Sequence, residues 1–444
     1  MKLVSCLSFL LFAFPLILPL SAGESATTQR FAVPGPEADL PGEGPVRRYD
    51  WFTKLWESRR SKWAGEVTQD QGAVVFFGDS ITQGWGDEMK GAFGEMKVAN
   101  RGISGDTTRG MLIRLQEDVL SLKPSAVVML MGTNDLEEGA SAEQVAGNVK
   151  LIIEAMKEHR ADLPVILNLV FPSSETKKRP VDQIKQINES LAAVVKGDDQ
   201  ITVVDTWTLF ANESGNAKEA EFPDLLHPNE AGYAKWAAAL TPVFATLGLV
   251  EKEAEPFDLE EGFQSLFDGK SLDGWGFRPT EPRKQSKKPR PNAPVFVEIK
   301  EAESFDGKTE SSDGRYEVIA GRLVVKTPAE GRRIQQIWTT EEFGGDFVLR
   351  LEFRATPNAD SGVFIRKPQL QCRDFPLAGP YFDLENYKPQ DWNTLEVTVK
   401  DGLARATCNG EVLEEAMEVP EVGPIGLEGD RGQMEYRRIR LKQL

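Results

Sequence analysis

Residues 73–80 read Ala73-Val74-Val75-Phe76-Phe77-Gly78-Asp79-Ser80. The first five residues form an uninterrupted apolar run, which is typical of a parallel strand that is buried on both faces. Polar residues begin where that strand is expected to end, and this edge of an open parallel sheet is where active sites lie. The stretch therefore predicts an α/β fold and places Ser80 at its functional edge.

Strand-like and helix-like patterns then alternate along the chain. Strict alternation predicts a parallel sheet covered by helices on both faces. Residues 49–63 carry aromatic residues at helical spacing and predict one more helix packed on this domain. The other expected strands are residues 97–100, 125–131, 165–170 and 201–205, and the other expected helices are residues 107–122, 142–159, 181–195 and 229–247.

The helical pattern stops at Leu247, so we expect the α/β domain to span residues 49–248. Residues 249–262 are acidic and contain Pro256, which predicts a linker. Short alternating stretches separated by Gly, Asn and Asp turns then predict an antiparallel β-sandwich or jelly roll over residues 263–444. The clearest of these stretches are residues 316–319, 322–326, 347–353, 362–366, 395–400 and 436–441. A basic, Pro-rich segment, residues 278–294, is expected to be an exposed loop.

The N-terminus has the pattern of a targeting signal. Lys2 precedes an apolar run, and the small residues Ser21, Ala22 and Gly23 follow, so residues 1–23 predict a signal peptide. An uncleaved membrane anchor is the alternative, which two prolines within the run and the lack of a basic flank disfavour. Residues 24–48 are expected to be a loose leader. The sequence thus predicts a secreted or periplasmic protein without integral membrane association after signal cleavage.

Composition narrows the range of partners. The 444-residue chain is long enough for two domains, and its formal net charge of -17 disfavours nucleic acid and anionic membranes as partners. The two cysteines beyond the signal peptide are Cys372 and Cys408. The sequence is compatible with a disulfide between them and also with two buried free thiols.

Acyl transfer needs a nucleophile, a base and a group that orients the base. The chain has only two histidines. His159 ends a predicted helix and is expected on the surface, so His227 is the base candidate for Ser80. Asp224 lies three residues before His227, where its carboxylate could fix the imidazole tautomer. The more ordinary interpretation of Asp224 alone is a turn residue.

The developing oxyanion of such a reaction needs hydrogen-bond donors. Gly102 ends the second expected strand and can present its backbone N–H at close approach. The side-chain amide of Asn134, after the third strand, and the N–H of Ser80 are the other two candidates. Each residue alone could be a turn or cap residue, and their joint occurrence at three strand ends is what indicates a site.

These segments resemble the four sequence blocks of the SGNH (GDSL-type) hydrolases. The resemblance covers residues 74–247, and the chain lacks the Gly-x-Ser-x-Gly elbow of the α/β-hydrolases. It implies a flavodoxin-like sheet and esterase activity, with Ser80, His227 and Asp224 as catalytic triad and Ser80, Gly102 and Asn134 as oxyanion hole. The second block is most similar to the branch with platelet-activating-factor acetylhydrolase-like proteins and carbohydrate acetylesterases. The blocks are Gly78-Asp79-Ser80-Ile81-Thr82, Asn100-Arg101-Gly102, Gly132-Thr133-Asn134-Asp135 and Asp224-Leu225-Leu226-His227.

Residues 263–444 resemble the 3-keto-disaccharide hydrolase family, which implies a concanavalin-like jelly roll associated with sugars. The resemblance lies in residues 266–275, 361–366, 391–395 and 423–427. Two departures put hydrolysis in doubt: Gln369 stands where the family has a glutamate, and Glu428-Gly429-Asp430 lacks the family's histidine. Glu385 and Glu428 are the remaining acid candidates, although solvated carboxylates are the more ordinary interpretation. Trp275, Trp338 and Trp392 could stack on sugars, with packing the more ordinary interpretation for each.

The sequence thus predicts a secreted serine esterase that acts on an acylated carbohydrate or another small ester, most simply as an O-deacetylase. The C-terminal domain is expected to bind or position glycan. Two alternatives are a glycan-binding protein with a vestigial esterase domain, and a sandwich that itself hydrolyses glycosides or keto-sugars. No cofactor and no metal site are predicted, and calcium in the sandwich stays open because its oxygen ligands leave little sequence signature.

Overall fold

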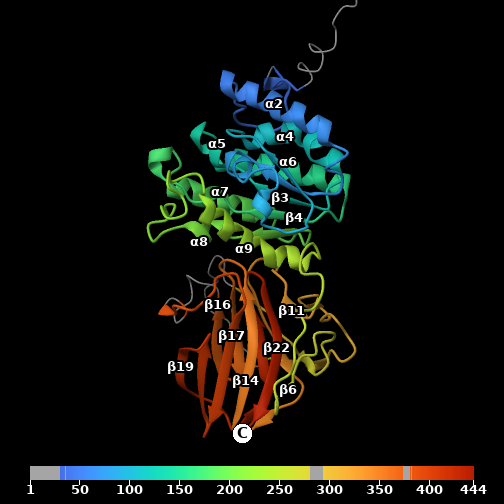
Figure 1. Ribbon diagram of the computed structural model, residues 1–444, viewed down its shortest axis with the longest axis vertical. Coiled ribbons are helices and arrows are strands. Elements are labelled where there is room, and N and C mark those ends of the chain that lie inside the picture. The colour runs from blue at the N-terminus through green and yellow to red at the C-terminus, as the bar shows by residue number, and fades with distance from the viewer. Residues whose placement is uncertain (1–30, 36, 281–293, 374–380, 382) are drawn as a thin grey trace, which may run out of the picture.

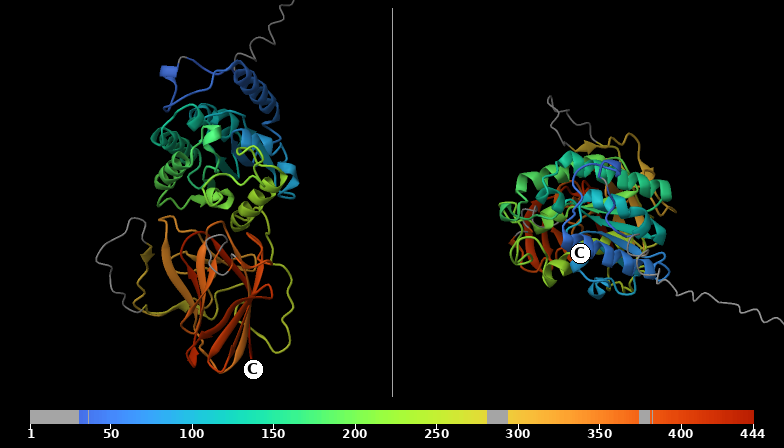
Figure 2. Two further views of the ribbon diagram at one scale, coloured as in Figure 1. Left: turned by 90° about the vertical axis from the view of Figure 1, so that its left-hand side faces the viewer. Right: turned by 90° about the horizontal axis from the view of Figure 1, so that it is seen from above.

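The computed structural model describes residues 31–35, 37–280, 294–373, 381 and 383–444. The expected signal peptide and most of the basic, Pro-rich segment lie outside these residues. The chain forms an α/β domain at one end and an all-β domain at the other (Figure 1). The left view of Figure 2 shows the same arrangement from another side. None of the helices within the described ranges is long and apolar enough to cross a membrane.

The α/β domain is built on a five-stranded parallel sheet in the order β2-β1-β3-β4-β5. This is the flavodoxin-like order, so the predicted fold class is confirmed. Its strands are β1 (Val74–Gly78), β2 (Val98–Gly102), β3 (Ala126–Leu130), β4 (Val165–Asn168) and β5 (Ile201–Val204). Its α-helices are α2 (Asp50–Glu66), α3 (Ser80–Gly84), α4 (Thr108–Asp118), α5 (Thr133–Glu137), α6 (Ala142–His159), α7 (Val181–Val194), α8 (Thr206–Phe210) and α9 (Glu230–Thr246).

Both faces of this sheet are covered, which explains the uninterrupted apolar run of β1. Val75 and Phe77 pack with α4, α6 and α7 on one face. Val74 and Phe76 pack with α3, α8 and α9 on the other. Strand β1 lies between β2 and β3, and Gly78 pairs with both Gly102 and Leu130. The polar segments that follow these three strands therefore meet at one edge of the sheet.

The C-terminal domain consists of two large sheets that enclose one apolar core. Its pairing is antiparallel except for the short pair β8–β12, so the predicted sandwich is confirmed. Cys372 and Cys408 are both buried in it as free thiols. The strands are β6 (Gln264–Ser265), β7 (Trp275–Phe277), β8 (Val295–Phe296), β9 (Glu303–Ser304), β10 (Tyr316–Ile319), β11 (Arg322–Val325), β12 (Arg333–Thr339), β13 (Phe343–Gly344), β14 (Phe347–Ala355), β15 (Asp360–Ile365), β16 (Gln369–Arg373), β17 (Asn393–Lys400), β18 (Leu403–Cys408), β19 (Glu411–Glu418), β20 (Val422–Gly423), β21 (Ile425–Gly429) and β22 (Met434–Gln443).

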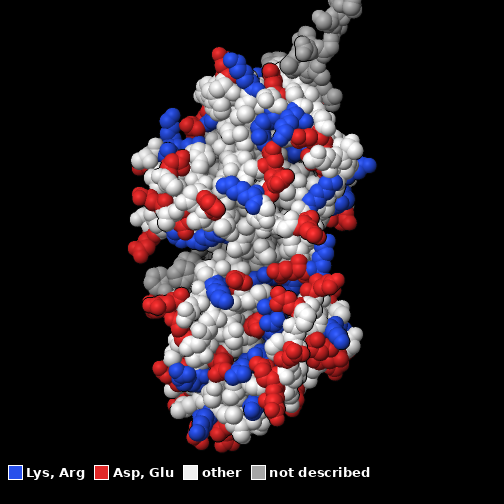
Figure 3. Space-filling view, viewed as in Figure 1, with Lys and Arg blue, Asp and Glu red and all other residues white. Residues whose placement is uncertain are grey.

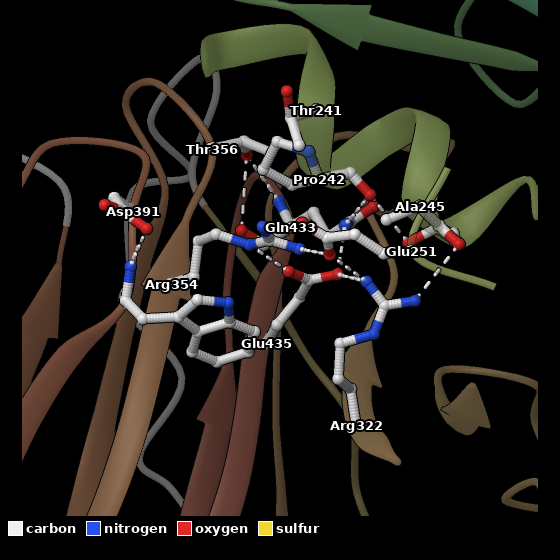
Figure 4. Close-up of polar contacts among 12 residues, drawn as sticks. Thr241, Pro242, Ala245, Glu251, Arg322, Arg354, Thr356, Asp391, Gln433 and Glu435 are labelled. Atoms are coloured by element: carbon white, nitrogen blue, oxygen red, sulfur yellow. Dashed lines mark hydrogen bonds and ion pairs between the residues drawn. The ribbon is translucent and has the colours of Figure 1, made fainter. Parts of the chain in front are cut away.

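The two domains are joined by polar contacts at the carboxyl end of α9 (Figure 4). Gln433 Nε2 donates to the carbonyl of Pro242 at 3.0 Å, and Arg322 Nη2 donates to the carbonyl of Ala245 at 3.2 Å. The last carbonyls of a helix attract donors and cations. The N–H groups of Leu247, Gly248 and Leu249 already donate to carbonyls at this end of α9, and the sandwich adds its two contacts to them. Behind these contacts, the buried carboxylate of Glu435 accepts from Arg354 Nε at 2.5 Å.

The amino-terminal segment differs from the expected loose leader in its described part. Arg109, on α4, donates to the carbonyls of Leu40, Pro41 and Gly44. Arg47 donates to Glu138 at 2.8 Å. The segment therefore packs on α4 and α5 as part of the domain. On the face of the molecule in Figure 3, acidic and basic side chains are interspersed.

Candidate active site

Ser80 is the first residue of the short helix α3, directly after β1. The carboxylate of Asp79 caps this helix by accepting from the N–H of Ile81 at 2.9 Å. Glycine at position 78 is required, because a Cβ there would lie 2.6 Å from the carbonyl oxygen of Leu130. The strand and helix thus meet in a tight turn that leaves Ser80 half-buried at the sheet edge.

His227 reaches Ser80 from a loop 147 residues later in the chain. Its Nε2 lies 3.0 Å from Ser80 Oγ, and its Nδ1 lies 2.8 Å from Asp224 Oδ2. The three side chains therefore form one continuous line of hydrogen-bonding groups. The other histidine, His159, is exposed at the end of α6.

Asp224 also shapes the loop that carries His227. Its Oδ1 accepts from the N–H groups of Leu226, at 3.0 Å, and of His227, at 2.7 Å. Partial burial opposes ionisation of Asp224, but these N–H groups and the imidazole together lower its pKa to about 2. The carboxylate is therefore charged at neutral pH and can hold the proton of the imidazole on Nδ1.

The three predicted oxyanion donors lie at neighbouring strand ends, but they differ in their present partners. Asn134 Nδ2 donates to the carbonyl of Asp106 at 3.0 Å, and the amide has a second hydrogen. The N–H of Gly102 donates to Asn100 Oδ1 at 2.9 Å. Glycine at position 102 is also needed for packing, since a Cβ would lie 2.3 Å from the backbone nitrogen of Gln83.

Arg179 is a further residue of this site that could not be predicted from the sequence. Its Nη2 donates to Asn134 Oδ1 at 3.0 Å, and its Nε donates to Thr133 Oγ1 at 3.0 Å. The side chain is buried and also pairs with Glu137 at 3.1 Å. A lone arginine in a loop before Pro180 has no motif, and only the fold brings it to Asn134.

Two more buried side chains hold the strand ends in place. Arg114, on α4, donates to Asp106 at 2.7 Å through Nε and to the carbonyl of Gly78 at 3.0 Å through Nη2. Asp135 accepts from the N–H and the hydroxyl of Thr108, and burial raises its pKa to about 6. The loops around Ser80 are therefore braced by charged groups that are removed from solvent.

A cavity of about 510 Å³ opens over Ser80 and His227. This volume is in the range of pockets that hold small ligands. Its wall includes Trp51, which was expected to pack on the domain with the other aromatic residues of its helix, and Lys177 and Lys178, which belong to no motif. The helical spacing of α2 could have indicated this role for Trp51. Its buried face carries Phe52, Trp56 and Trp63, and Trp51 lies outside that face.

The sandwich has its own polar cluster on the outer face of the second sheet. Glu428 accepts from Gln336 at 2.7 Å and from Gln369 at 2.5 Å, and burial raises its pKa. The expectation of a solvated Glu428 was therefore wrong, because the two amides replace water around it. Glu385 is exposed, as expected.

The three tryptophans of the sandwich differ in their surroundings. Trp275 is fully buried in the core, and Trp392 is covered by the guanidinium of Arg437 at 4.0 Å from its ring. Trp338 is half-buried beside Phe364, with ring centroids 5.1 Å apart, on the same face as Glu428. Trp338 is thus the tryptophan of the three that remains open to stack on a sugar. Within the described ranges, no group of three or more His, Cys, Asp or Glu side chains could hold a metal ion.

Comparison with known proteins agrees with this architecture. Residues 76–235 match the family model of the GDSL-like Lipase/Acylhydrolase family, and residues 262–442 match that of the 3-keto-alpha-glucoside-1,2-lyase-like domain. Platelet-activating factor acetylhydrolase IB subunit alpha1 of Homo sapiens is 27% identical over 210 residues, which are 47% of this chain and 86% of that protein. The alpha2 subunit of Bos taurus is 29% identical over 184 residues, 40% of this chain and 79% of its own length.

Solved structures with similar chains include a GDSL-like lipase from Bacteroides thetaiotaomicron. It is 27% identical, has a TM-score of 0.39, and the match covers 43% of this chain and 98% of the lipase. A lipase/acylhydrolase from Enterococcus faecalis is 26% identical and has a TM-score of 0.33. The match covers 39% of this chain and 94% of the Enterococcus chain.

The chain is a carboxylic ester hydrolase. It carries a GDSL-like lipase/acylhydrolase domain at residues 76–235, and a 3-keto-disaccharide hydrolase-like domain follows at residues 262–442.

Proposed function

We propose that this protein is an exported serine esterase that removes acetyl groups from carbohydrates. The observation that carries the proposal is the line of contacts from Asp224 through His227 to Ser80, at 2.8 and 3.0 Å. Residues far apart in the sequence come together here in the order that a catalytic triad requires.

In this proposal His227 Nε2 takes the proton of Ser80 Oγ as the oxygen attacks the carbonyl carbon of the ester. The negative charge that forms on the carbonyl oxygen is stabilised by the N–H of Ser80, the free hydrogen of Asn134 Nδ2, and the N–H of Gly102. The Gly102 hydrogen is then shared between Asn100 Oδ1 and the oxyanion, as in other three-centre hydrogen bonds. Each such donor contributes about 10²–10³-fold to the rate.

Collapse of the tetrahedral intermediate breaks the ester bond, and the imidazolium of His227 gives its proton to the leaving sugar oxygen, which departs as a hydroxyl. The acyl group stays on Ser80 Oγ. A water molecule, deprotonated by His227, then attacks the acyl-serine and releases the carboxylic acid and free Ser80. The charged carboxylate of Asp224 stabilises the imidazolium in both halves of the cycle.

Acetyl is proposed as the acyl group because the relatives that match the N-terminal domain are acetylhydrolases. The cavity wall also contains polar residues such as Ser104, Asn134 and Thr176, which suits a short acyl group. A carbohydrate is proposed as the alcohol because a domain similar to a sugar-processing family follows. The outer face of the sandwich, with Trp338, Phe364 and Glu428, is proposed to bind glycan. Export rests on the sequence of residues 1–23.

The alternative of hydrolysis by the sandwich itself is less well supported. A catalytic carboxyl needs access to substrate, but both oxygens of Glu428 accept hydrogen bonds from the amides of Gln336 and Gln369. A glycan-binding protein with a vestigial esterase domain would have no need for the aligned contacts at Ser80.

The test compares the wild-type protein with Ser80→Ala and with Ser58→Ala, an exposed serine on α2. Release of acetate from acetylated polysaccharides and from p-nitrophenyl acetate is measured. We expect Ser80→Ala to lose at least about 10³-fold in kcat and Ser58→Ala to match wild type. Normal turnover by Ser80→Ala would overturn the mechanism, and sugar cleavage by that variant would indicate a catalytic sandwich.

A further inference from the structure

An exposed aromatic pair lies beside the cavity over Ser80. The side chains of Tyr49 and Trp51 are 53% and 51% exposed, and their rings are stacked with centroids 6.4 Å apart at an interplanar angle of 15°. Trp51 lines the cavity. Large aromatic side chains that are half-exposed and stacked at the mouth of a pocket offer a flat apolar surface to a ligand.

The position of Trp51 is fixed by its surroundings. Gly105 has a φ of +85°, and a Cβ on it would lie 2.5 Å from the edge of the indole ring. The segment before Trp51 is held by Arg47, which donates to Glu138, and by Thr107, whose hydroxyl donates to the carbonyl of Pro45 at 2.8 Å. The aromatic wall is therefore a built part of the cavity.

Two neighbouring lysines line the same cavity. Lys177 ends the short 3-10 helix η4 (Glu175–Lys177), and its Nζ lies 4.0 Å from Asp224 Oδ2, at the limit of an ion pair. Lys178 is exposed and forms no ion pair with any described residue. By contrast, the cations Arg47 and Arg179 in the cavity wall are both paired with Glu137.

This leaves positive charge without a full partner next to Ser80, in a chain of net charge -17. A flat apolar wall and two ammonium groups on one small cavity match the chemistry of an acidic sugar. The ring of such a sugar has an apolar face that can stack on an indole, and its carboxylate can accept charge-assisted hydrogen bonds from lysine.

We propose that the cavity is a subsite for an acidic sugar unit, with the ring on Trp51 and the anionic group at Lys177 and Lys178. The substrate class is then O-acetylated glycans that contain uronic acids, and Tyr49 extends the stacking surface to a neighbouring unit. This inference rests on the proposed esterase function, of which it specifies the substrate.

The first experiment measures binding without turnover, in full-length Ser80→Ala protein. The probes are one deacetylated oligouronide and the same oligouronide with its carboxyl groups methyl-esterified, which removes the charge and keeps the sugar. We expect the acid form to bind about tenfold more tightly, in a salt-dependent manner. In the double variant Lys177→Gln and Lys178→Gln, the ratio of the dissociation constants for the acid form and the methyl ester should be close to one.

Trp51→Ala should weaken the binding of both forms by roughly tenfold, because stacking does not depend on the carboxyl charge. Lys150→Gln, an exposed lysine on α6, is the matched control and should leave the ratio unchanged. Equal binding of the acid and the ester by the parent protein would overturn the subsite. A sulfated neutral oligosaccharide that outcompetes the oligouronide would overturn the assignment of the anion to a carboxylate.

The second experiment compares kcat/KM of the wild-type enzyme on the acetylated oligouronide and on its methyl ester. A preference of about tenfold for the acid form is expected. Equal rates on both forms, with turnover abolished by Ser80→Ala, would refute the acidic subsite and leave the esterase intact. Absence of acetate release from any substrate would refute the esterase, while the binding ratio would still decide the subsite.

Discussion

Arg179 Nη2 donates a hydrogen bond to Asn134 Oδ1 at 3.0 Å, and Asn134 Nδ2 donates in turn to the carbonyl of Asp106. These two contacts fix which end of the amide faces the cavity. Without Arg179 the amide could rotate and place its oxygen, an acceptor, where the proposed reaction needs a donor. Arg179 therefore acts through Asn134 as a positioning residue.

We expect Arg179→Met to lower kcat by about 10²-fold, because the misoriented amide is nearly equivalent to a lost oxyanion donor. The KM for a small neutral ester should change by less than about threefold, since the Arg179 side chain is only 3% exposed and is engaged by other protein groups. Arg179→Lys should recover only part of kcat, because one ammonium group cannot serve Asn134 and Thr133 as the guanidinium does. Steady-state kinetics check this, and a rise in KM with constant kcat would contradict the positioning role.

Asp224→Asn tests the role of the carboxylate at His227. The amide oxygen can still accept from the N–H groups of Leu226 and His227, so the loop should keep its shape. An amide no longer stabilises the imidazolium, and kcat should fall by about 10³-fold. Because the pKa of Asp224 is about 2, protonation of this group should not limit wild-type activity anywhere above about pH 4. An acid limb that disappears in Asp224→Asn would contradict this assignment.

Asp79 should make the stability of the protein depend on pH. Burial raises its pKa from 3.8 to about 6, so the folded protein holds this proton more tightly than the unfolded chain does. The stabilisation that this bound proton gives the folded protein is fully present below about pH 4. It is lost as the pH rises through 6, the pKa of Asp79 in the folded protein. Asp79→Asn keeps the oxygen that caps α3 and does not titrate. Relative to this variant, the free energy of unfolding of the wild-type protein should fall by up to about 3 kcal/mol over this range.

Urea unfolding of both proteins between pH 4.5 and 7.5 measures this difference, and the subtraction removes the other titrating groups. A difference that stays constant across the range would show that Asp79 is ionised in the folded protein at low pH as well.

Glu435 should anchor the sandwich to the α/β domain. Its buried carboxylate pairs with Arg354 and Arg322, and the latter reaches the carbonyl of Ala245 in α9. Glu435→Gln removes the negative charge between the two arginines. The free energy of unfolding should fall by about 3 kcal/mol as a result. Calorimetry should then show separate melting of the two domains. The matched control is Glu396→Gln, whose pair with Arg350 is partly exposed and should be worth less than about 1 kcal/mol.

The sequence predicted the parallel sheet well because β1 and β3, at its centre, are fully buried and carry unbroken apolar runs. It missed β12 for a physical reason: Gln335 occupies a core-facing position and interrupts the apolar alternation. Strand β19 is polar because it lies at the edge of its sheet, where β18 is its one partner among the described strands, and its side chains are mostly exposed.

In the candidate site, the contact between Ser80 and His227 could be predicted because one histidine was excluded by its place at the end of a helix. The contact of Arg179 with Asn134 could not, since it depends on how the loop before α7 folds back. Nor could the sequence show that Asn100 Oδ1 already occupies the N–H of Gly102.

Helix α9 begins three residues after His227 and ends against the sandwich, and its 17 residues span about 25 Å. A sugar unit at Ser80 and a sugar unit on the sandwich are therefore never the same unit. A bound polymer would be tethered, and its acetylated units would be held at a raised effective concentration near the esterase. A short oligosaccharide gains nothing from such a tether, so under the proposed function the second domain would make the esterase prefer long glycan chains.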